Sequence, residues 1–185
     1  MFEEKDANER QKDMERFWAD LDNETDRGMV LATGCYFDGL LEDCLRSYFA
    51  EGKMTDDLLS DGNGLGSFSA KNRCCLSLRI TEPVEYKTLK LMAVIRNKFA
   101  HKLRADFTQP RIGDLTLEMA RCFFEEIVFE RLELVRKTPR KLFEFTAFCL
   151  NDNLWLRPMD THIHVAHYPK NMPEYVANLL DNQQT

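Results

Sequence analysis

The sequence predicts an all-α protein: an up-and-down helical bundle with a short irregular C-terminal arm. Apolar residues recur at helical spacing in several long segments, and these segments begin with capping residues such as Thr25 or with a proline in the first turn, as at Pro83 and Pro139. The alternation of apolar and polar residues that is typical of a strand is confined to positions 161–167. A chain of 185 residues can bury a sizeable core within one domain.

The first quarter of the chain predicts two helices. Residues 1–22 are highly charged with a few apolar anchors, which indicates an amphipathic N-terminal helix, and a second helix should begin after the capping segment 23–26 and end near Glu51, before Gly52. We expect its core positions to be Val30, Phe37, Leu41, Cys44 and Tyr48. Small residues (Gly28, Ala32, Gly34 and Gly39) permit close contact with another helix.

Two further helices should precede the most informative segment, which is the helix that opens at Pro83. Residues 55–59 indicate one short helical turn, and the glycine-containing stretch 60–67 is a loop that lacks the Gly-Lys-Ser/Thr sequence of a phosphate-binding loop. Ser67 or Ser69 should cap a helix that runs to about Ile80. The helix that opens at Pro83 should end near Leu103, with Leu89, Met92, Phe99 and Leu103 on its core face.

The second half predicts a connector over 106–113 and two more helices, over 115–136 and 139–150. The first should bury Ala120, Phe123, Phe124, Ile127, Leu134 and Val135, and the second Leu142, Phe145 and Cys149. We therefore divide the chain into an N-terminal helix or arm (1–22), a helical domain (23–155) and a C-terminal tail (156–185).

Charge is distributed unevenly along the chain. Positions 71–104 hold nine basic and two acidic residues, so this window carries +7 while the remainder carries −13 of the net −6. Such a window indicates either a local anion site or a solvated helix face. For an anion or nucleic-acid site, the candidates are Arg73, Lys98, Lys102 and Arg104.

Neither metal ligands nor a targeting segment stand out. The six cysteines form no CxxC pair and should be reduced and mostly buried, so we predict no metal site and no cofactor. His162, His164 and His167 resemble a metal cluster in spacing, but a surface arm is the better interpretation. The sequence has no apolar run of membrane-spanning length and no leader-like start, so we expect a cytoplasmic protein that does not enter a membrane.

The residues best suited to catalysis are Arg96, Asn97 and His101, which lie within six positions of one another. Histidine can exchange a proton with a ribose hydroxyl, arginine can hold a phosphate, and asparagine can orient either group; these are the parts of a metal-independent ribonuclease. At about 100° per residue, Arg96 lies roughly 140° from His101 around a helix, so a second helix or subunit would have to complete such a site. The structural alternative is that Arg96 pairs with a carboxylate such as Glu42 and that His101 caps a helix end.

Three separated segments resemble the mannitol operon repressor family. These are 26–31 with Leu40-Leu41-Glu42, then 65–71, and then Ile95-Arg96-Asn97-Lys98-Phe99-Ala100-His101; the segment Thr138-Pro139-Arg140-x-x-Phe143 also fits. The Arg-Asn-x-x-x-His element is also similar to the signature of the HEPN group of helical domains. The resemblance covers roughly residues 24–155.

The resemblance implies a HEPN-like bundle that pairs as a homodimer, and a regulatory role in transcriptional repression. We find no helix suited to reading DNA, so this role would require a protein partner or a bound anion. The HEPN likeness implies the alternative of a ribonuclease, possibly a toxin, that acts on RNA through Arg96, Asn97 and His101, with Glu42 and Lys71 as supporting neighbours. A nucleotide-binding sensor is a third hypothesis.

Overall fold

The computed structural model describes residues 7–124, 129 and 138–159, and all regular elements in these residues are helical. They are α1 (Ala7–Leu21), α2 (Asp26–Tyr48), α3 (Lys53–Leu59), α4 (Phe68–Ser77), α5 (Pro83–His101), α6 (Pro110–Phe123), α8 (Pro139–Leu154) and the short 3-10 turn η1 (Arg157–Met159). The predicted all-α helical bundle is confirmed.

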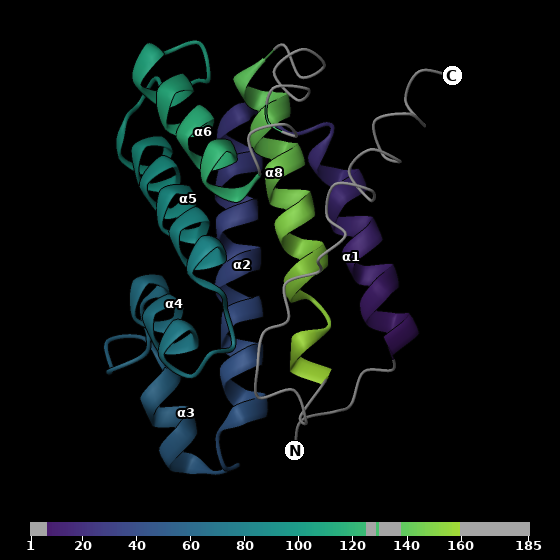
Figure 1. Ribbon diagram of the computed structural model, residues 1–185, viewed down its shortest axis with the longest axis vertical. Coiled ribbons are helices and arrows are strands. Elements are labelled where there is room, and N and C mark those ends of the chain that lie inside the picture. Colours follow the sequence, from purple (N-terminus) through teal and green to yellow (C-terminus); the bar gives the residue numbers. More distant parts are fainter. Residues whose placement is uncertain (1–6, 125–128, 130–137, 160–185) are drawn as a thin grey trace.

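Helix α2 runs through the middle of the bundle (Figure 1). Helices α5 and α6 lie along one side of it, α8 and α1 along the other, and α4 packs against both α2 and α5. The core between them is rich in aromatic rings, with Phe37, Phe99, Phe123 and Phe143 contributed by four different helices and fully buried. Burying one such side chain is worth about 1.5–3 kcal/mol, so these contacts hold the long helices together.

Side-chain caps fix where the helices begin. The hydroxyl of Thr25 accepts the Gly28 N–H at 3.0 Å, and the hydroxyl of Ser67 accepts the Ala70 N–H at 3.2 Å. Helix α5 opens with a capping box, in which Glu85 accepts the backbone N–H of Glu82 at 2.7 Å. These starts agree with the sequence, and Ser67 rather than Ser69 is the cap of α4.

Several predicted helix ends and core positions are wrong. Helix α2 ends at Tyr48 rather than Glu51, and α4 ends at Ser77 rather than Ile80. Because Tyr48 lies in the last turn of α2, its side chain is half exposed rather than buried. Helix α5 ends at His101, and the chain turns into an extended conformation at Lys102. Leu103 therefore leaves the helical pattern and is 92% exposed instead of belonging to the core.

The connector after α5 is shorter than predicted. Pro110 is the first residue of α6, a position where its missing N–H costs nothing, so the helix starts five residues before Leu115. Helix α8 continues past Leu150 to Leu154. The predicted core residues Ile127, Leu134 and Val135, the histidine cluster at 162–167 and the tail after residue 159 lie outside the described residues.

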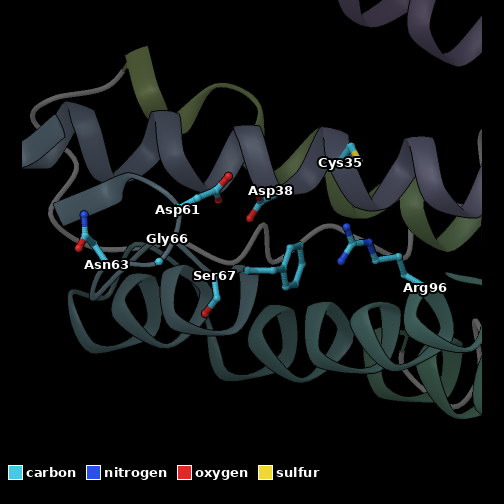
Figure 2. Close-up of a pocket in the computed structure, with 9 residues that line it drawn as sticks. Cys35, Asp38, Asp61, Asn63, Gly66, Ser67 and Arg96 are labelled. Carbon is cyan, nitrogen blue, oxygen red and sulfur yellow. The ribbon is translucent and has the colours of Figure 1, made fainter. Parts of the chain in front are cut away.

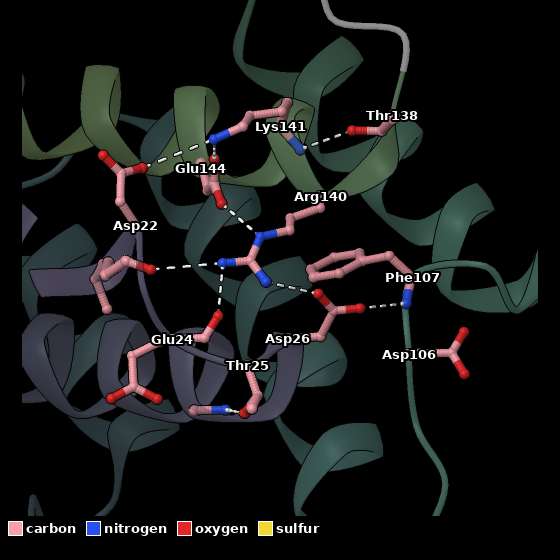
Figure 3. Close-up of polar contacts among 12 residues, drawn as sticks. Asp22, Glu24, Thr25, Asp26, Asp106, Phe107, Thr138, Arg140, Lys141 and Glu144 are labelled. Atoms are coloured by element: carbon pink, nitrogen blue, oxygen red, sulfur yellow. Dashed lines mark hydrogen bonds and ion pairs between the residues drawn. The ribbon is translucent and has the colours of Figure 1, made fainter.

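Arg140 joins three parts of the bundle (Figure 3). Its guanidinium contacts the Asp26 carboxylate and the Glu24 carbonyl oxygen, each at 2.8 Å, while its Nε donates to Glu144 at 2.8 Å. The other oxygen of Asp26 accepts the backbone N–H of Phe107 at 3.2 Å. Helix α8, the start of α2 and the connector between α5 and α6 are thereby held in one network.

A second arginine, Arg157, fixes the N-terminal end of α5. Arg157 in η1 forms a bidentate ion pair with Glu85, both oxygens at 2.7 Å, and donates to the Ile80 carbonyl oxygen at 2.6 Å. Glu85 is fully buried, and a buried carboxylate is tolerated only when it is paired in this way. No helix in the described part of the chain is long and apolar enough to cross a membrane.

Candidate functional site

Arg96 occupies a gap that Gly34 leaves in α2. A Cβ atom added to Gly34 would lie 2.9 Å from Cγ of Arg96 and 3.2 Å from its Cδ, so the arginine stem fills the space that any larger residue would need. The close helix contact expected at the small residues of α2 thus occurs at Gly34. At Gly39, by contrast, an added Cβ would meet no atom within 4 Å.

The guanidinium of Arg96 lines a cavity of about 590 Å³ between α2, α4 and the loop that precedes α4. Figure 2 shows Arg96 at one end and Asp38, Asp61 and Asn63 along the remainder of the cavity. The lining residues come from α2, from the loop, from the start of α4 and from α5: Cys35, Asp38, Asp61, Gly62, Asn63, Gly66, Ser67, Phe68 and Arg96. The volume is that of a site for a small molecule or for one group of a larger partner.

Two polar atoms of the lining residues, one a donor and one an acceptor, lack hydrogen-bond partners among the described residues. Nε of Arg96, a donor, and Oδ1 of Asp38, an acceptor, are both buried and have no partner among the described residues. Buried polar atoms are nearly always hydrogen-bonded, so an unsatisfied pair at one cavity calls for a bound group. Both atoms belong to side chains that line the cavity, so an occupant could bind them once these side chains turn toward it.

Two carboxylates near Arg96, those of Asp38 and Glu42, pair with Lys71, and Arg96 forms no ion pair with the described residues; Asp61, which also lines the cavity, forms none with them either. Lys71 is almost fully buried, and its Nζ contacts Glu42 at 2.8 Å and Asp38 at 3.2 Å. Glu42 also binds Arg46 at 2.9 Å. The alternative in which Arg96 pairs with Glu42 is therefore wrong, because Glu42 pairs with Lys71 and Arg46 instead.

The same contacts shift the ionisation of this cluster. Burial is the largest single effect and opposes the charges of both Glu42 and Lys71, but the hydrogen bonds and charges of their partners together outweigh it: Lys71 and Arg46 for Glu42, and Glu42 and Asp38 for Lys71. The pKa of Glu42 consequently lies below its ordinary 4.5, and the pKa of Lys71 lies above its ordinary 10.5. Glu42 and Lys71, the predicted supporting neighbours, thus form a charged anchor beside the cavity, although neither lines it.

Asn97 and His101 do not share the cavity with Arg96. Both side chains are exposed, and neither lines the cavity. Helix α5 is continuous through all three residues, so the angle of roughly 140° between Arg96 and His101 expected from a regular helix applies. Within one chain, the predicted catalytic trio is split between two sides of α5.

The four cations predicted to bind anions also lie outside the cavity. Arg73, Lys102 and Arg104 are exposed, and Lys98 is half-buried. Partial burial and the neighbouring charges of Arg111 and Lys102 lower the pKa of Lys98. Arg111 was not predicted as a member of this cationic group, because it follows Pro110 in a segment that the sequence indicates as a connector.

Most of the cavity lining was also missed by sequence reasoning. Cys35, Asp61, Asn63 and Phe68 were not singled out, and Cys35 is exposed although most of the cysteines were expected to be buried. The available signal was the glycine-containing loop directly before a capped helix, since such a loop brings backbone and small polar groups close to a neighbouring helix. No family model, curated protein or solved structure matches this chain.

Replacing Lys71 with methionine should remove a pH-dependent part of the stability. The lowered pKa of Glu42 stabilises the fold above pH 4.5 and this contribution is lost as the pH falls through the folded-state pKa; the raised pKa of Lys71 stabilises it below pH 10.5 and is lost at higher pH. We expect Lys71→Met to lower the free energy of unfolding by about 1–3 kcal/mol at pH 7, since it removes a buried ammonium group that pairs with both Asp38 and Glu42 and leaves Glu42 with Arg46 alone.

Urea unfolding of the wild-type protein and of Lys71→Met, each at pH 7 and at pH 3, measures this loss of stability. The difference between them should shrink at pH 3, and a difference that is equal or larger at pH 3 would contradict the assignment. Lys141→Met serves as the control, because that lysine is 51% exposed and should matter little.

Proposed function

We propose that this chain is a regulatory module that acts in transcriptional repression through a partner or a bound anion, and that the Arg96 cavity is where the anionic group binds. The proposal includes a cytoplasmic homodimer. It requires no DNA-reading helix in the chain itself. The observation that carries it is the guanidinium of Arg96, which lines the cavity and forms no ion pair with the described residues, while Asp38 and Glu42 nearby pair with Lys71.

The two unsatisfied atoms narrow the class of ligand. A phosphate or carboxylate oxygen would accept from Arg96, whose planar fork suits such groups, and an amino or amide group on the same ligand would donate to Asp38. A nucleotide or an amino acid carries both kinds of group. Phe68 adds an aromatic side chain to the lining, against which a planar ring can pack.

The residues on which the family resemblance rests also converge in space. Gly66, Ser67 and Phe68 come from one resembling segment and Arg96 from another, yet they line one cavity. Lys71, from the segment 65–71, binds Glu42, which belongs to the segment formed by 26–31 and 40–42. Asp26 of that same segment forms an ion pair at 2.8 Å with Arg140, which comes from the segment that begins at Thr138. This convergence supports a relationship with the mannitol operon repressor family, which we propose on these grounds.

Arg96→Ala should abolish ligand binding at the cavity. Isothermal titration with inorganic phosphate, AMP and glutamate should find at least one binder, which Arg96→Ala weakens tenfold or more. Arg96→Lys should recover only part of the affinity, because lysine keeps the charge but loses the fork. Arg73→Ala is the matched control, since that arginine is exposed on α4 and does not line the cavity.

Two results would contradict this proposal. One is equal weakening of binding by Arg73→Ala and Arg96→Ala, or no binding of any of these ligands. The other is tight, sequence-specific binding of a promoter fragment by the purified protein alone, which would rule out the dependence on a partner or ligand.

A metal-independent ribonuclease is the second candidate, favoured by the accessibility of the histidine and the unpaired arginine. His101 is exposed and has no hydrogen bond to the described residues, so its imidazole can take a proton from a ribose 2′-hydroxyl. The 2′-oxygen would attack the phosphorus and expel the 5′-oxygen, which takes a proton from solvent water, leaving a 2′,3′-cyclic phosphate while Arg96 holds the phosphate oxygens. Because the two residues lie on different sides of α5, Arg96 of one subunit would work with His101 of another.

RNA cleavage in the presence of EDTA tests this candidate. His101→Ala and Arg96→Ala should each be inactive, and a mixture that re-equilibrates into dimers should regain about a quarter of the wild-type activity, because half of the dimers are mixed and each mixed dimer has one complete site. Intact RNA with the wild-type protein would refute the ribonuclease. Activity of the single variants, or a mixture that stays inactive, would refute the shared site.

A further inference from the structure

The outward face of α5 carries a line of positive charge. Residues that are three, four or seven positions apart in a helix share one face, and the side chains on this face are exposed, with Lys98 half-buried. In order they are Lys87, Lys90, Val94, Asn97, Lys98 and His101. At about 1.5 Å per residue, the row is roughly 21 Å long. Lys102 and Arg111 extend it beyond the end of α5, where both side chains are exposed.

No acidic side chain neutralises this row. Lys87, Lys90, Lys98, Lys102 and Arg111 form no ion pair with the described residues, in a chain whose net charge is −6. The one acidic residue of α5, Glu85, stands at its start and is buried and paired with Arg157. The exposed acids of α6, Asp114 and Glu118, make no ion pair with the lysines either.

Helix stability does not account for the row. Cations favour the last turn of a helix, which covers Lys98 and His101. Lys87 and Lys90 stand in the first half of α5, where the helix dipole gives them no advantage. The crowding of like charges costs free energy: partial burial lowers the pKa of Lys98 most, and the charges of Arg111 and Lys102 lower it further.

We propose that this row, from Lys87 to Arg111, is a second binding surface that holds the phosphodiester backbone of a nucleic acid. Cations repeated at helical spacing can contact successive phosphates of one strand. Within α5 the row has one large apolar residue, the partly exposed Val94, and Leu103 beyond the end of the helix is a lone exposed leucine, so the surface lacks the clustered aromatic or aliphatic anchors of a protein interface. A phosphate backbone therefore fits better than an acidic protein.

This surface is separate from the Arg96 cavity. Arg96 contacts α2 at Gly34, whereas the row faces away from α2; Val94 and Arg96 are about 160° apart around the helix. The row could hold a nucleic acid whether or not the cavity binds a small ligand. If the ribonuclease hypothesis is correct, the row would bring RNA to His101.

Fluorescence anisotropy of the full-length protein with labelled mixed-sequence RNA and DNA tests the proposal. Lys87→Gln with Lys90→Gln should weaken binding tenfold or more and reduce the slope of log affinity against log salt by about 1 for each lysine. The matched control is Lys12→Gln with Lys53→Gln, which removes the same charge from exposed positions on α1 and α3. Thermal melts should find all variants equally folded.

The outcomes separate this proposal from the others. The proposal is supported if the control double variant and Arg96→Ala both bind nucleic acid as tightly as the wild type while Lys87→Gln with Lys90→Gln binds it more weakly. Equal weakening by both double variants would mean that only net charge matters, and would overturn it. No binding of RNA or DNA at low salt, or equally tight and row-dependent binding of polyglutamate, would overturn it as well.

Discussion

The contact between Gly34 and Arg96 is the constraint on which the rest of the site depends. Because Gly34 has no side chain, the stem of Arg96 lies directly against α2, and a Cβ atom there would come within 2.9 Å of Cγ. This contact directs the guanidinium into the cavity beside Asp38, while Asp38 and Glu42 pair with Lys71 and Glu42 also pairs with Arg46. Among the described residues, Arg96 is thus a charged donor without an ion-pair partner at the point where α2 and α5 meet.

The same contact divides α5 into two faces. One face carries Arg96 toward α2 and the cavity, and the other carries Asn97 and His101 with the lysines toward solvent. A regular helix cannot bring these faces together, so one chain can bind a small anionic ligand without assembling an arginine–histidine catalytic pair. Regulation and RNA cleavage are therefore distinguished by whether a second subunit contributes His101, and the binding of nucleic acid along the row is compatible with either.

Sequence reasoning predicted the helical class and most helix starts, because caps and prolines are local signals: Thr25, Pro83 and Pro139 all act as the sequence indicates. It failed where the outcome depends on distant contacts or on the end of a pattern. Leu103 fits the apolar period but follows the last residue of α5, and Pro110 begins a helix although it was read as part of a connector. Arg96 was predicted as a site residue, but its neighbours Asp61 and Asn63 come from a loop whose position is set by tertiary packing.

A double-mutant cycle between Gly34 and Arg96 measures the central contact directly. Gly34→Ala should destabilise the protein by about 1–3 kcal/mol through overpacking, despite the helix propensity of alanine. In the Arg96→Ala background it should instead be stabilising by up to about 1 kcal/mol, as Gly39→Ala should be in both backgrounds, because nothing lies within 4 Å of an added Cβ at Gly39. If Gly34→Ala and Gly39→Ala have the same effect on the free energy of unfolding whether or not Arg96 is present, the account of how Arg96 is positioned is wrong.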